Sequence, residues 1–267
     1  MPVARISGSH LTSASGPVDI YYRDIGTGRP LIFLHGGWGY EVYPFDTQAA
    51  ALGVNNRIII PDRTGYGRSQ KIERLPADFH NRAASETFAL IDSLEIERPV
   101  LWGHSDGAVI AAKMAIAKPE AFRGVILEAI HFYRVKPASR EYFETMLNNP
   151  ETLGERVKAV LAQDHGEHSW RTLIALNGQA WLRIADESIE AEQDLYDGRL
   201  SELSTPALIL HGANDPRTEP GELDAVRAAL PKASLSLIEE GGHSPHSHPR
   251  ASSECTLAAK RFLASVL

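Results

Sequence analysis

The sequence predicts an α/β fold: a mostly parallel, eight-stranded twisted sheet with helices on both faces and a helical cap insertion. Three observations support this prediction, namely recurring short apolar runs, longer helix-like segments between them, and one long stretch without strand signals. A chain of 267 residues, 43% of them hydrophobic, is long enough for one domain of this class with a large core.

Seven short apolar runs are the predicted strands of the sheet. Runs of consecutive apolar residues are typical of strands buried on both faces, as in parallel sheets. Helix-like segments lie between several of the runs, and this alternation favours right-handed crossovers with helices covering both faces. The predicted strands are 18–22, 31–34, 57–60, 99–102, 125–127, 207–210 and 235–238, and the predicted helices are 79–94, 108–117, 220–230 and 252–266.

The stretch from 131 to 204 has no strand run but several helix-like pieces, at 141–147, 153–162 and 170–176. Its length of about 70 residues far exceeds an ordinary connection. We therefore predict an α/β core formed by 1–130 and 205–267, and a helical cap formed by 131–204. The cap is expected over the carboxyl ends of the strands, where open α/β sheets bind ligands. The alternative is an ordinary pair of crossover helices.

Composition excludes several classes of partner. The net charge is −7 and the pI is near 5.9, so no basic surface for nucleic acid or an anionic membrane is expected. No apolar run approaches 20 residues, which argues against a membrane-spanning helix. Cys255 is the single cysteine, and the first residues lack an apolar signal segment, so we expect a cytoplasmic protein without an intramolecular disulfide. The oligomeric state has no signal in the sequence.

Ser105 is the predicted nucleophile. It is the central residue of Gly103-His104-Ser105-Asp106-Gly107, which matches G-x-S-x-G between a predicted strand and a predicted helix. In that context the serine lies on a sharp turn that raises its hydroxyl above the sheet, at the positive end of a helix. The turn leaves no room for side chains two residues to either side, which accounts for both glycines. His104 is a poor base candidate, because neighbouring side chains at a tight turn point apart.

His243 is the predicted general base and Asp215 the predicted acid that orients it. Asp215 follows the predicted strand 207–210 and His243 follows 235–238, so both belong at the same sheet edge as Ser105. The chain order Ser, Asp, His is the order expected for this arrangement. The alternatives are Glu128 as the acid, His246 or His248 as the base, and a metal-binding role for the histidine-rich run that contains them.

A second loop is predicted to bind an oxyanion. His35-Gly36-Gly37-Trp38-Gly39 follows the predicted strand 31–34. A tetrahedral acyl-transfer intermediate needs two preorganised N–H donors, and a glycine lets backbone approach the substrate closely. We expect one donor to be the amide of Asp106 and the other that of Gly37, with Trp38 as the second choice. The Trp38 side chain is also the best candidate for contact with substrate.

With these residues in place, the chain resembles the α/β-hydrolase superfamily, and in particular its compact, capped, carboxylesterase-like members. LIFLHGGWG is similar to the oxyanion segment, ERPVLWGHSDGA to the nucleophile elbow, TPALILHGANDP to the acid loop and GGHSPHSHP to the histidine loop. IIIPDRTGYGRS resembles the D-x-R-G-x-G-x-S turn of these proteins, except that Thr64 is inserted between arginine and glycine. The resemblance covers nearly the whole chain outside the predicted cap.

The resemblance implies a serine hydrolase that acts on a small-molecule acyl substrate through an acyl-serine intermediate, with no cofactor and no metal. The branches that dehalogenate alkyl halides or open epoxides use a carboxylate nucleophile, and they are disfavoured because that position holds Ser105. Carboxylesterase, lactonase, C–C bond hydrolase and amidase or aminopeptidase activities remain open, as do acyltransferase or perhydrolase activity and a weakly catalytic sensing role.

Some side chains near the predicted site have two interpretations. Asp106 could bind a cationic substrate group or could be held by the surrounding backbone. Trp170, Trp181 and His131 could line an acyl pocket or belong to the core.

Overall fold

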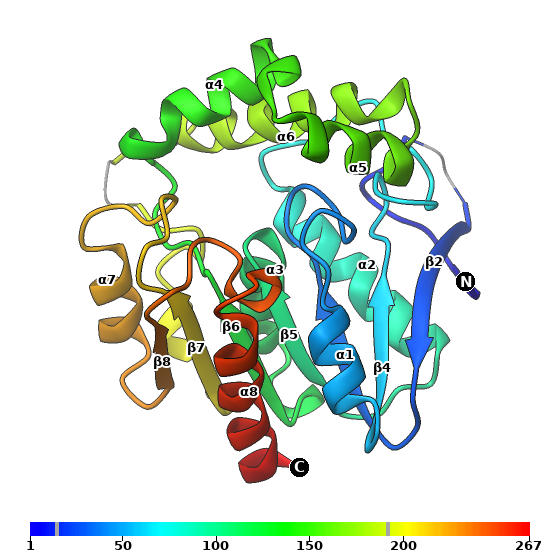
Figure 1. Ribbon diagram of the computed structural model, residues 1–267, viewed down its shortest axis with the longest axis vertical. Helices are drawn as coiled ribbons and strands as arrows, with labels where there is room; N and C mark the ends of the chain where they lie inside the picture. Colours follow the sequence, from blue (N-terminus) through cyan, green and yellow to red (C-terminus); the bar gives the residue numbers. More distant parts are fainter. Residues whose placement is uncertain (14–15, 191–192) are drawn as a thin grey trace.

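The computed structural model describes residues 1–13, 16–190 and 193–267. Its centre is an eight-stranded sheet in the order β1-β2-β4-β3-β5-β6-β7-β8 (Figure 1). The β1–β2 and β2–β4 pairs are antiparallel and all other neighbours are parallel, which confirms the predicted fold class. The strands are β1 (Val3–Ile6), β2 (Val18–Ile25), β3 (Arg29–Leu34), β4 (Asn56–Pro61), β5 (Val100–His104), β6 (Gly124–Glu128), β7 (Ala207–Gly212) and β8 (Ser234–Ile238).

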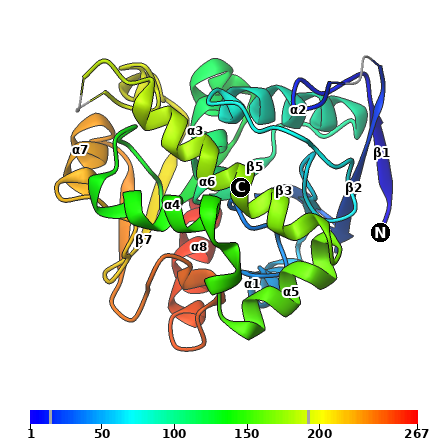
Figure 2. The same cartoon turned by 90° about the horizontal axis from the view of Figure 1, so that it is seen from above.

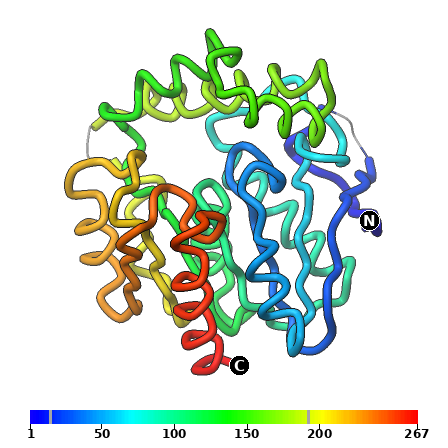
Figure 3. The backbone as a smooth tube through the Cα atoms, in the orientation of Figure 1, coloured from blue at the N-terminus to red at the C-terminus, as the bar shows by residue number. Residues whose placement is uncertain are grey.

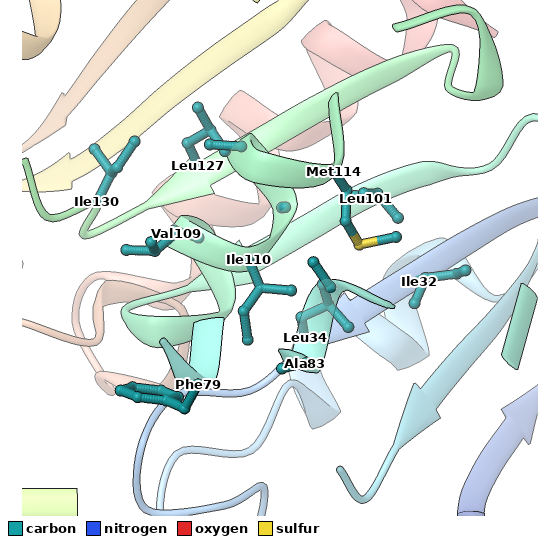
Figure 4. Packing of buried hydrophobic residues seen from close by; sticks show 14 of the residues in the cluster. Ile32, Leu34, Phe79, Ala83, Leu101, Val109, Ile110, Met114, Leu127 and Ile130 are labelled. Atoms are coloured by element: carbon teal, nitrogen blue, oxygen red, sulfur yellow. The ribbon is translucent and has the colours of Figure 1, made fainter. Parts of the chain in front are cut away.

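Helices cover both faces of the sheet, and the alternation of side chains along each strand explains how. In β3, Ile32 and Leu34 join a cluster with α2 and α3, whereas Leu31 and Phe33 join a second cluster with α1 and α8. Figure 4 shows the first cluster. The helices are α1 (Asp46–Leu52), α2 (Phe79–Ser93), α3 (Asp106–Ala117), α4 (Arg140–Asn148), α5 (Glu155–His165), α6 (Ser169–Asp186), α7 (Glu222–Ala229) and α8 (Ser252–Val266).

The structure departs from the sequence-based elements at three places. β1 was not among the seven predicted runs, because it is a short edge strand with alternating rather than continuous burial. The seven-residue helix α1 was also not predicted. The prediction that 235–238 is buried on both faces is wrong, since Leu235 and Leu237 are 38% and 44% exposed. β8 is the last strand of the sheet, so it has a neighbouring strand on one side only.

Helices α4, α5 and α6 lie between β6 and β7 in the chain and cross one end of the sheet (Figures 1 and 2). The backbone trace shows the same segment spanning the top of the molecule (Figure 3). Helix α6 continues through Asn177-Gly178, a pair that usually marks a turn. Glycine is required there because a Cβ at 178 would lie 2.5 Å from the carbonyl oxygen of Phe143 in α4.

The division into a core of 1–130 and 205–267 and a cap of 131–204 stays a prediction. These ranges include residues 14–15 and 191–192, which lie outside the described residues. Within the described part of the chain, no helix has the length and apolar character needed to cross a membrane.

Candidate active site

Five loops meet at the carboxyl ends of the parallel strands, and each carries a residue of the candidate site. Ser105 follows β5, and the loop with Gly37 follows β3. His131 follows β6, Asp215 follows β7, and His243 follows β8. The α4–α6 segment crosses the same end of the sheet (Figure 1). Residues up to 206 positions apart in the chain, from 37 to 243, therefore come together because parallel strands end at one edge.

The backbone of Ser105 has the strained geometry that the sequence predicts for the elbow. Its φ is 55°, in a region that non-glycine residues rarely occupy. The Ser105 amide donates to the carbonyl oxygen of Glu128 at 2.9 Å, which helps hold the turn. A Cβ at Gly103 would lie 2.1 Å from the Gly107 carbonyl oxygen, and one at Gly107 would lie 2.0 Å from that of Leu34. Both glycines are therefore required for the close packing of the turn.

Ser105, His243 and Asp215 form a continuous hydrogen-bonded chain. The Ser105 Oγ is 3.0 Å from His243 Nε2. His243 Nδ1 is 3.0 Å and 2.9 Å from the two carboxylate oxygens of Asp215. Burial alone would raise the pKa of the Asp215 carboxyl, but the facing His243 and its hydrogen bonds lower it below the ordinary value. Asp215 is thereby kept as a carboxylate, which requires Nδ1 of His243 to carry the proton and leaves Nε2 free to accept one.

The other candidates for base and acid have different partners. Glu128 is fully buried, accepts from His246 Nδ1 at 2.7 Å and from Trp102 Nε1 at 2.8 Å, and does not contact His243. His104 Nε2 lies 2.9 Å from the His243 carbonyl oxygen and 3.0 Å from Ser244 Oγ, so it supports the histidine loop. In the described part of the chain, no three His, Cys, Asp or Glu side chains are grouped to hold a metal ion.

The glycine-rich loop after β3 lies beside the nucleophile. A Cβ at Gly36 would be 3.2 Å from the Ser105 Cβ. Arg63 fixes this loop, because its guanidinium donates to the carbonyl oxygens of His35 and Gly36 at 3.1 Å and 3.0 Å. Among the described residues, the amides of Gly37, Trp38 and Asp106 donate to no acceptor. The oxyanion role of Gly37 and Asp106 stays a prediction, and these N–H groups have no protein acceptor that would compete with it in the described part of the chain.

A small cavity of about 170 Å³ opens above Ser105. Trp38 lies in its wall, where its ring stacks against Tyr43 and Tyr142 with centroids 6.0 Å and 6.1 Å apart. Arg217 also lines the cavity, with its guanidinium carbon 3.2 Å from the Tyr142 ring centroid. Sequence reasoning did not single out the following lining residues: Tyr43, Tyr142, Phe143, Asn177, Pro216 and Arg217. Arg217 could have been noticed, since it lies two residues after Asp215.

Comparison with known proteins identifies the family. The sequence model of the alpha/beta hydrolase family matches residues 31–254, which is most of the chain. The chain belongs to the α/β hydrolase family.

Several relatives of this α/β hydrolase are described as hydrolases or esterases. The human serine hydrolase BPHL is 26% identical over 96% of this chain and 88% of its own length. The bifunctional esterase/perhydrolase DCH of Acinetobacter calcoaceticus is 26% identical over 92% of this chain and 95% of its own. The solved esterase EaEST from Exiguobacterium antarcticum superimposes with a TM-score of 0.75 at 19% identity, covering 98% of this chain and 99% of that one, which shows a shared fold. The present chain is accordingly a hydrolase of this family.

The Asp106 side chain of this α/β hydrolase is held by side chains rather than by backbone. Its Oδ1 accepts from His80 Nε2 and Trp181 Nε1, each at 3.1 Å, and its Oδ2 accepts from Asn177 Nδ2 at 3.2 Å. Burial alone would raise the pKa of Asp106, but hydrogen bonds from His80 and Asn177 help to lower it below the ordinary value. The interpretation that the surrounding backbone holds this carboxylate was therefore wrong, and Trp181 both lines the cavity and anchors Asp106. Trp170 belongs to the core.

A second histidine contacts the nucleophile. His131 Nε2 lies 3.3 Å from Ser105 Oγ, and its ring is stacked on that of His243 with centroids 5.4 Å apart. Its Nδ1 is 3.0 Å from the Lys136 ammonium, which forms a buried ion pair with Glu222 at 2.7 Å. Sequence reasoning considered His131 only as a possible pocket residue, and it missed Lys136 and Glu222 because nothing local links positions 136 and 222.

The buried histidines predict that acid destabilises the fold. Burial, the largest cause in each case, lowers the pKa of six histidines below 6.5, to about 4 for His165 and about 3 for His104. Because these pKa values are lowered, the folded state keeps the six imidazoles neutral at pH values just below 6.5, where the unfolded chain takes up protons. The unfolded state thus binds more protons, and the free energy of unfolding falls as the pH drops below 6.5.

We therefore expect a lower urea midpoint at pH 5 than at pH 7.5. The free energy of unfolding falls by at most about 1.4 kcal/mol per pH unit for each histidine that is neutral in the fold and protonated in the unfolded chain. Asp164 has the opposite effect on the free energy of unfolding between pH 3.8 and 6, because burial raises its pKa to about 6 and the folded state then binds the extra proton. We expect the six histidines to outweigh this single carboxyl group. Equilibrium urea unfolding across this range measures the effect. An unchanged midpoint at pH 5 would contradict the assignment of neutral buried histidines.

Proposed function

We propose that this α/β hydrolase is a serine hydrolase that cleaves a small carboxylic ester or related acyl compound through an acyl-serine intermediate. The observation that carries the proposal is the 3.0 Å contact between Ser105 Oγ and His243 Nε2, with Asp215 hydrogen-bonded behind the imidazole. A nucleophile, a base and an orienting acid in that sequence are the elements of acyl transfer to serine.

The proposed mechanism uses the same groups in acylation and in deacylation, with His243 as base and then as acid in each half. Ser105 Oγ attacks the carbonyl carbon while His243 Nε2 takes its proton, and Asp215 stabilises the imidazolium. The Gly37 and Asp106 amides donate to the oxyanion of the tetrahedral intermediate. His243 then protonates the leaving alcohol, and the acyl-serine remains. Water, deprotonated by His243, attacks the acyl group; the bond to Ser105 Oγ then breaks, His243 returns the proton to that oxygen, and the acid is released.

The charges around the cavity favour an anionic group on the substrate over a cationic one. The Asp106 carboxylate already accepts three hydrogen bonds, so a substrate ammonium would have to compete with His80, Trp181 and Asn177. The Arg217 guanidinium, in contrast, forms no ion pair with a carboxylate among the described residues; only the backbone N–H of Arg217 bonds to Asp215. A guanidinium without a carboxylate partner at the wall of the cavity is a ready donor pair for a substrate carboxylate.

We expect Arg217→Met to lower kcat/KM for an ester that carries a carboxylate by about tenfold or more, because one charge-assisted contact is worth about 1.5–3 kcal/mol. The matched neutral ester, with a methyl ester or amide in place of the carboxylate, should change by less than about threefold. Arg261→Met, on the exposed surface of α8, serves as the control for the loss of one arginine. Equal effects of Arg217→Met on both esters would contradict a carboxylate subsite.

The function itself is tested by a screen of esters, lactones, amides and diketones of varied chain length, with peroxide or alcohol added as alternative acyl acceptors. The screen is run beside fluorophosphonate labelling of the protein, with mass spectrometry to locate the label. Labelling at Ser105 together with turnover of an acyl substrate supports a serine hydrolase. Labelling without turnover of any class would favour a sensing role, and no labelling at Ser105 would refute the proposed nucleophile.

A further inference from the structure

His131 is a second imidazole at the nucleophile, and its ring stacks against that of His243. Its side chain is buried, at 5% exposure, and its Nε2 lies 3.3 Å from Ser105 Oγ. The same oxygen is 3.0 Å from His243 Nε2, so two imidazoles lie within hydrogen-bond distance of one hydroxyl. A hydroxyl has one proton to donate and two lone pairs to accept. If His243 receives the proton, the contact with His131 must be one in which Ser105 Oγ accepts.

Lys136 determines which nitrogen of His131 carries the proton. Its ammonium group has three protons and three acceptors nearby: the two Glu222 oxygens at 2.8 Å and 2.7 Å, and His131 Nδ1 at 3.0 Å. An ammonium cannot accept a hydrogen bond, so Nδ1 of His131 must be the acceptor and must be unprotonated. In the neutral ring the proton then lies on Nε2, which points at Ser105 Oγ.

The surroundings of His131 keep the ring neutral. Burial is the main cause that lowers its pKa well below 6.5, and the positive charge of Lys136 adds to it. His243, His80 and His211 also face the ring, and each disfavours an additional positive charge there. A neutral imidazole with its proton on Nε2 has no lone pair to offer to the Ser105 hydroxyl. His131 is therefore excluded as the general base by its tautomer.

We propose that His131 is a second catalytic histidine, which donates a hydrogen bond from Nε2–H to Ser105 Oγ. This inference rests on the proposed function. Negative charge builds on Oγ when its proton passes to His243 during attack, and again when Oγ leaves the acyl group during deacylation. The donor stabilises that charge in both steps, and His131 keeps its own proton throughout. Lys136 is a positioning residue that fixes the tautomer, and Glu222 holds Lys136 in place.

The first test compares two substitutions that differ in the donor alone. His131→Gln places an amide N–H near the position of Nε2, whereas His131→Leu fills the space without a donor. We expect His131→Leu to lower the second-order rate of fluorophosphonate labelling of Ser105, and kcat/KM for the best ester, by about 10- to 100-fold. His131→Gln should stay within about fivefold of the unsubstituted protein. Circular dichroism and the thermal midpoint establish that both variants are folded.

Each outcome of this test decides the proposal. Wild-type rates in His131→Leu would overturn it, and so would equal losses in both folded variants, because the loss would then follow from packing rather than from the donor. The labelling rate does not require a known substrate. If the wild-type protein neither labels at Ser105 nor turns over any substrate, the proposed function fails instead, and the two failures are thus distinguishable.

The role of Lys136 is tested with a double-mutant cycle. Lys136→Met removes the donor to Nδ1, so the other tautomer of His131 becomes populated and labelling should slow. In the His131→Gln background the same substitution should have little further effect, because glutamine has no tautomer to lose. The ¹⁵N shifts of the His131 ring report the tautomer directly. An equal loss in both backgrounds, or a wild-type ring with its proton on Nδ1, would overturn the assignment.

Discussion

Replacement of Ser105 by alanine is expected to lower kcat/KM by about 10⁴-fold or more while the fold is retained. The substitution removes the oxygen that His243 Nε2 contacts at 3.0 Å, and no other hydroxyl contacts that nitrogen among the described residues. Stability should change little, because alanine meets the same backbone strain at φ 55° as serine. Initial rates on the best substrate and the thermal midpoint measure the two effects.

Ser85→Ala is the matched control for this prediction. Ser85 lies on the exposed face of α2, and its hydroxyl donates to the Asn81 carbonyl oxygen of its own helix. Its replacement should leave both kcat/KM and fluorophosphonate labelling unchanged. Near-normal hydrolysis by the Ser105→Ala variant, measured above a preparation blank, would refute the acyl-serine mechanism and the role of His243 and Asp215 with it.

The second large effect is expected from Asp215→Asn, which should lower kcat at neutral pH by about 10³- to 10⁴-fold. Asparagine can turn its NH₂ group toward His243 Nδ1, which then accepts and leaves the proton on Nε2. A protonated Nε2 cannot take the proton of Ser105, so the base is lost even though the geometry is kept. Steady-state kinetics at pH 7–8 measure the loss.

Glu128→Gln separates this effect from the general loss of a buried carboxylate. Glu128 is fully buried and hydrogen-bonded to His246 and Trp102, so its substitution should lower the free energy of unfolding. The tautomer of His243 does not depend on Glu128, and the folded variant should keep kcat within about tenfold. The reverse pattern, with Glu128→Gln inactive and Asp215→Asn active, would transfer the role of the acid to Glu128.

Local signals in the sequence were sufficient to place the groups of the proposed mechanism at one edge of the sheet. Each predicted strand is a short apolar run, and each candidate residue follows directly after one. The glycines at 103 and 107 mark the elbow because the backbone contacts there exclude a Cβ. Such signals lie within a few residues of the position they describe, and they can therefore be recognised without knowing the packing.

The exposure of β8 and the course of α6 show where local signals were insufficient. Leu235 and Leu237 look like core residues in the sequence, but their exposure depends on β8 being the last strand of the sheet. Asn177-Gly178 is a pair typical of turns, yet both residues lie inside α6. The glycine is needed there because α4 packs too closely for a Cβ. In both cases the neighbouring elements, rather than the residues themselves, decide the outcome.

The sequence by itself determined the fold class, seven of the eight strands along the chain, and the loops in which Ser105, Asp215, His243 and Gly37 lie. Only the tertiary structure decided that the Asp106 carboxylate accepts hydrogen bonds from three side chains and that Arg217 lines the cavity. It also decided that His131 contacts Ser105, with Lys136 and Glu222 behind its ring. The physical reason is that strand and turn preferences depend on near neighbours in the chain. Hydrogen bonds between side chains 26 to 86 residues apart depend on how the packed elements are placed in space.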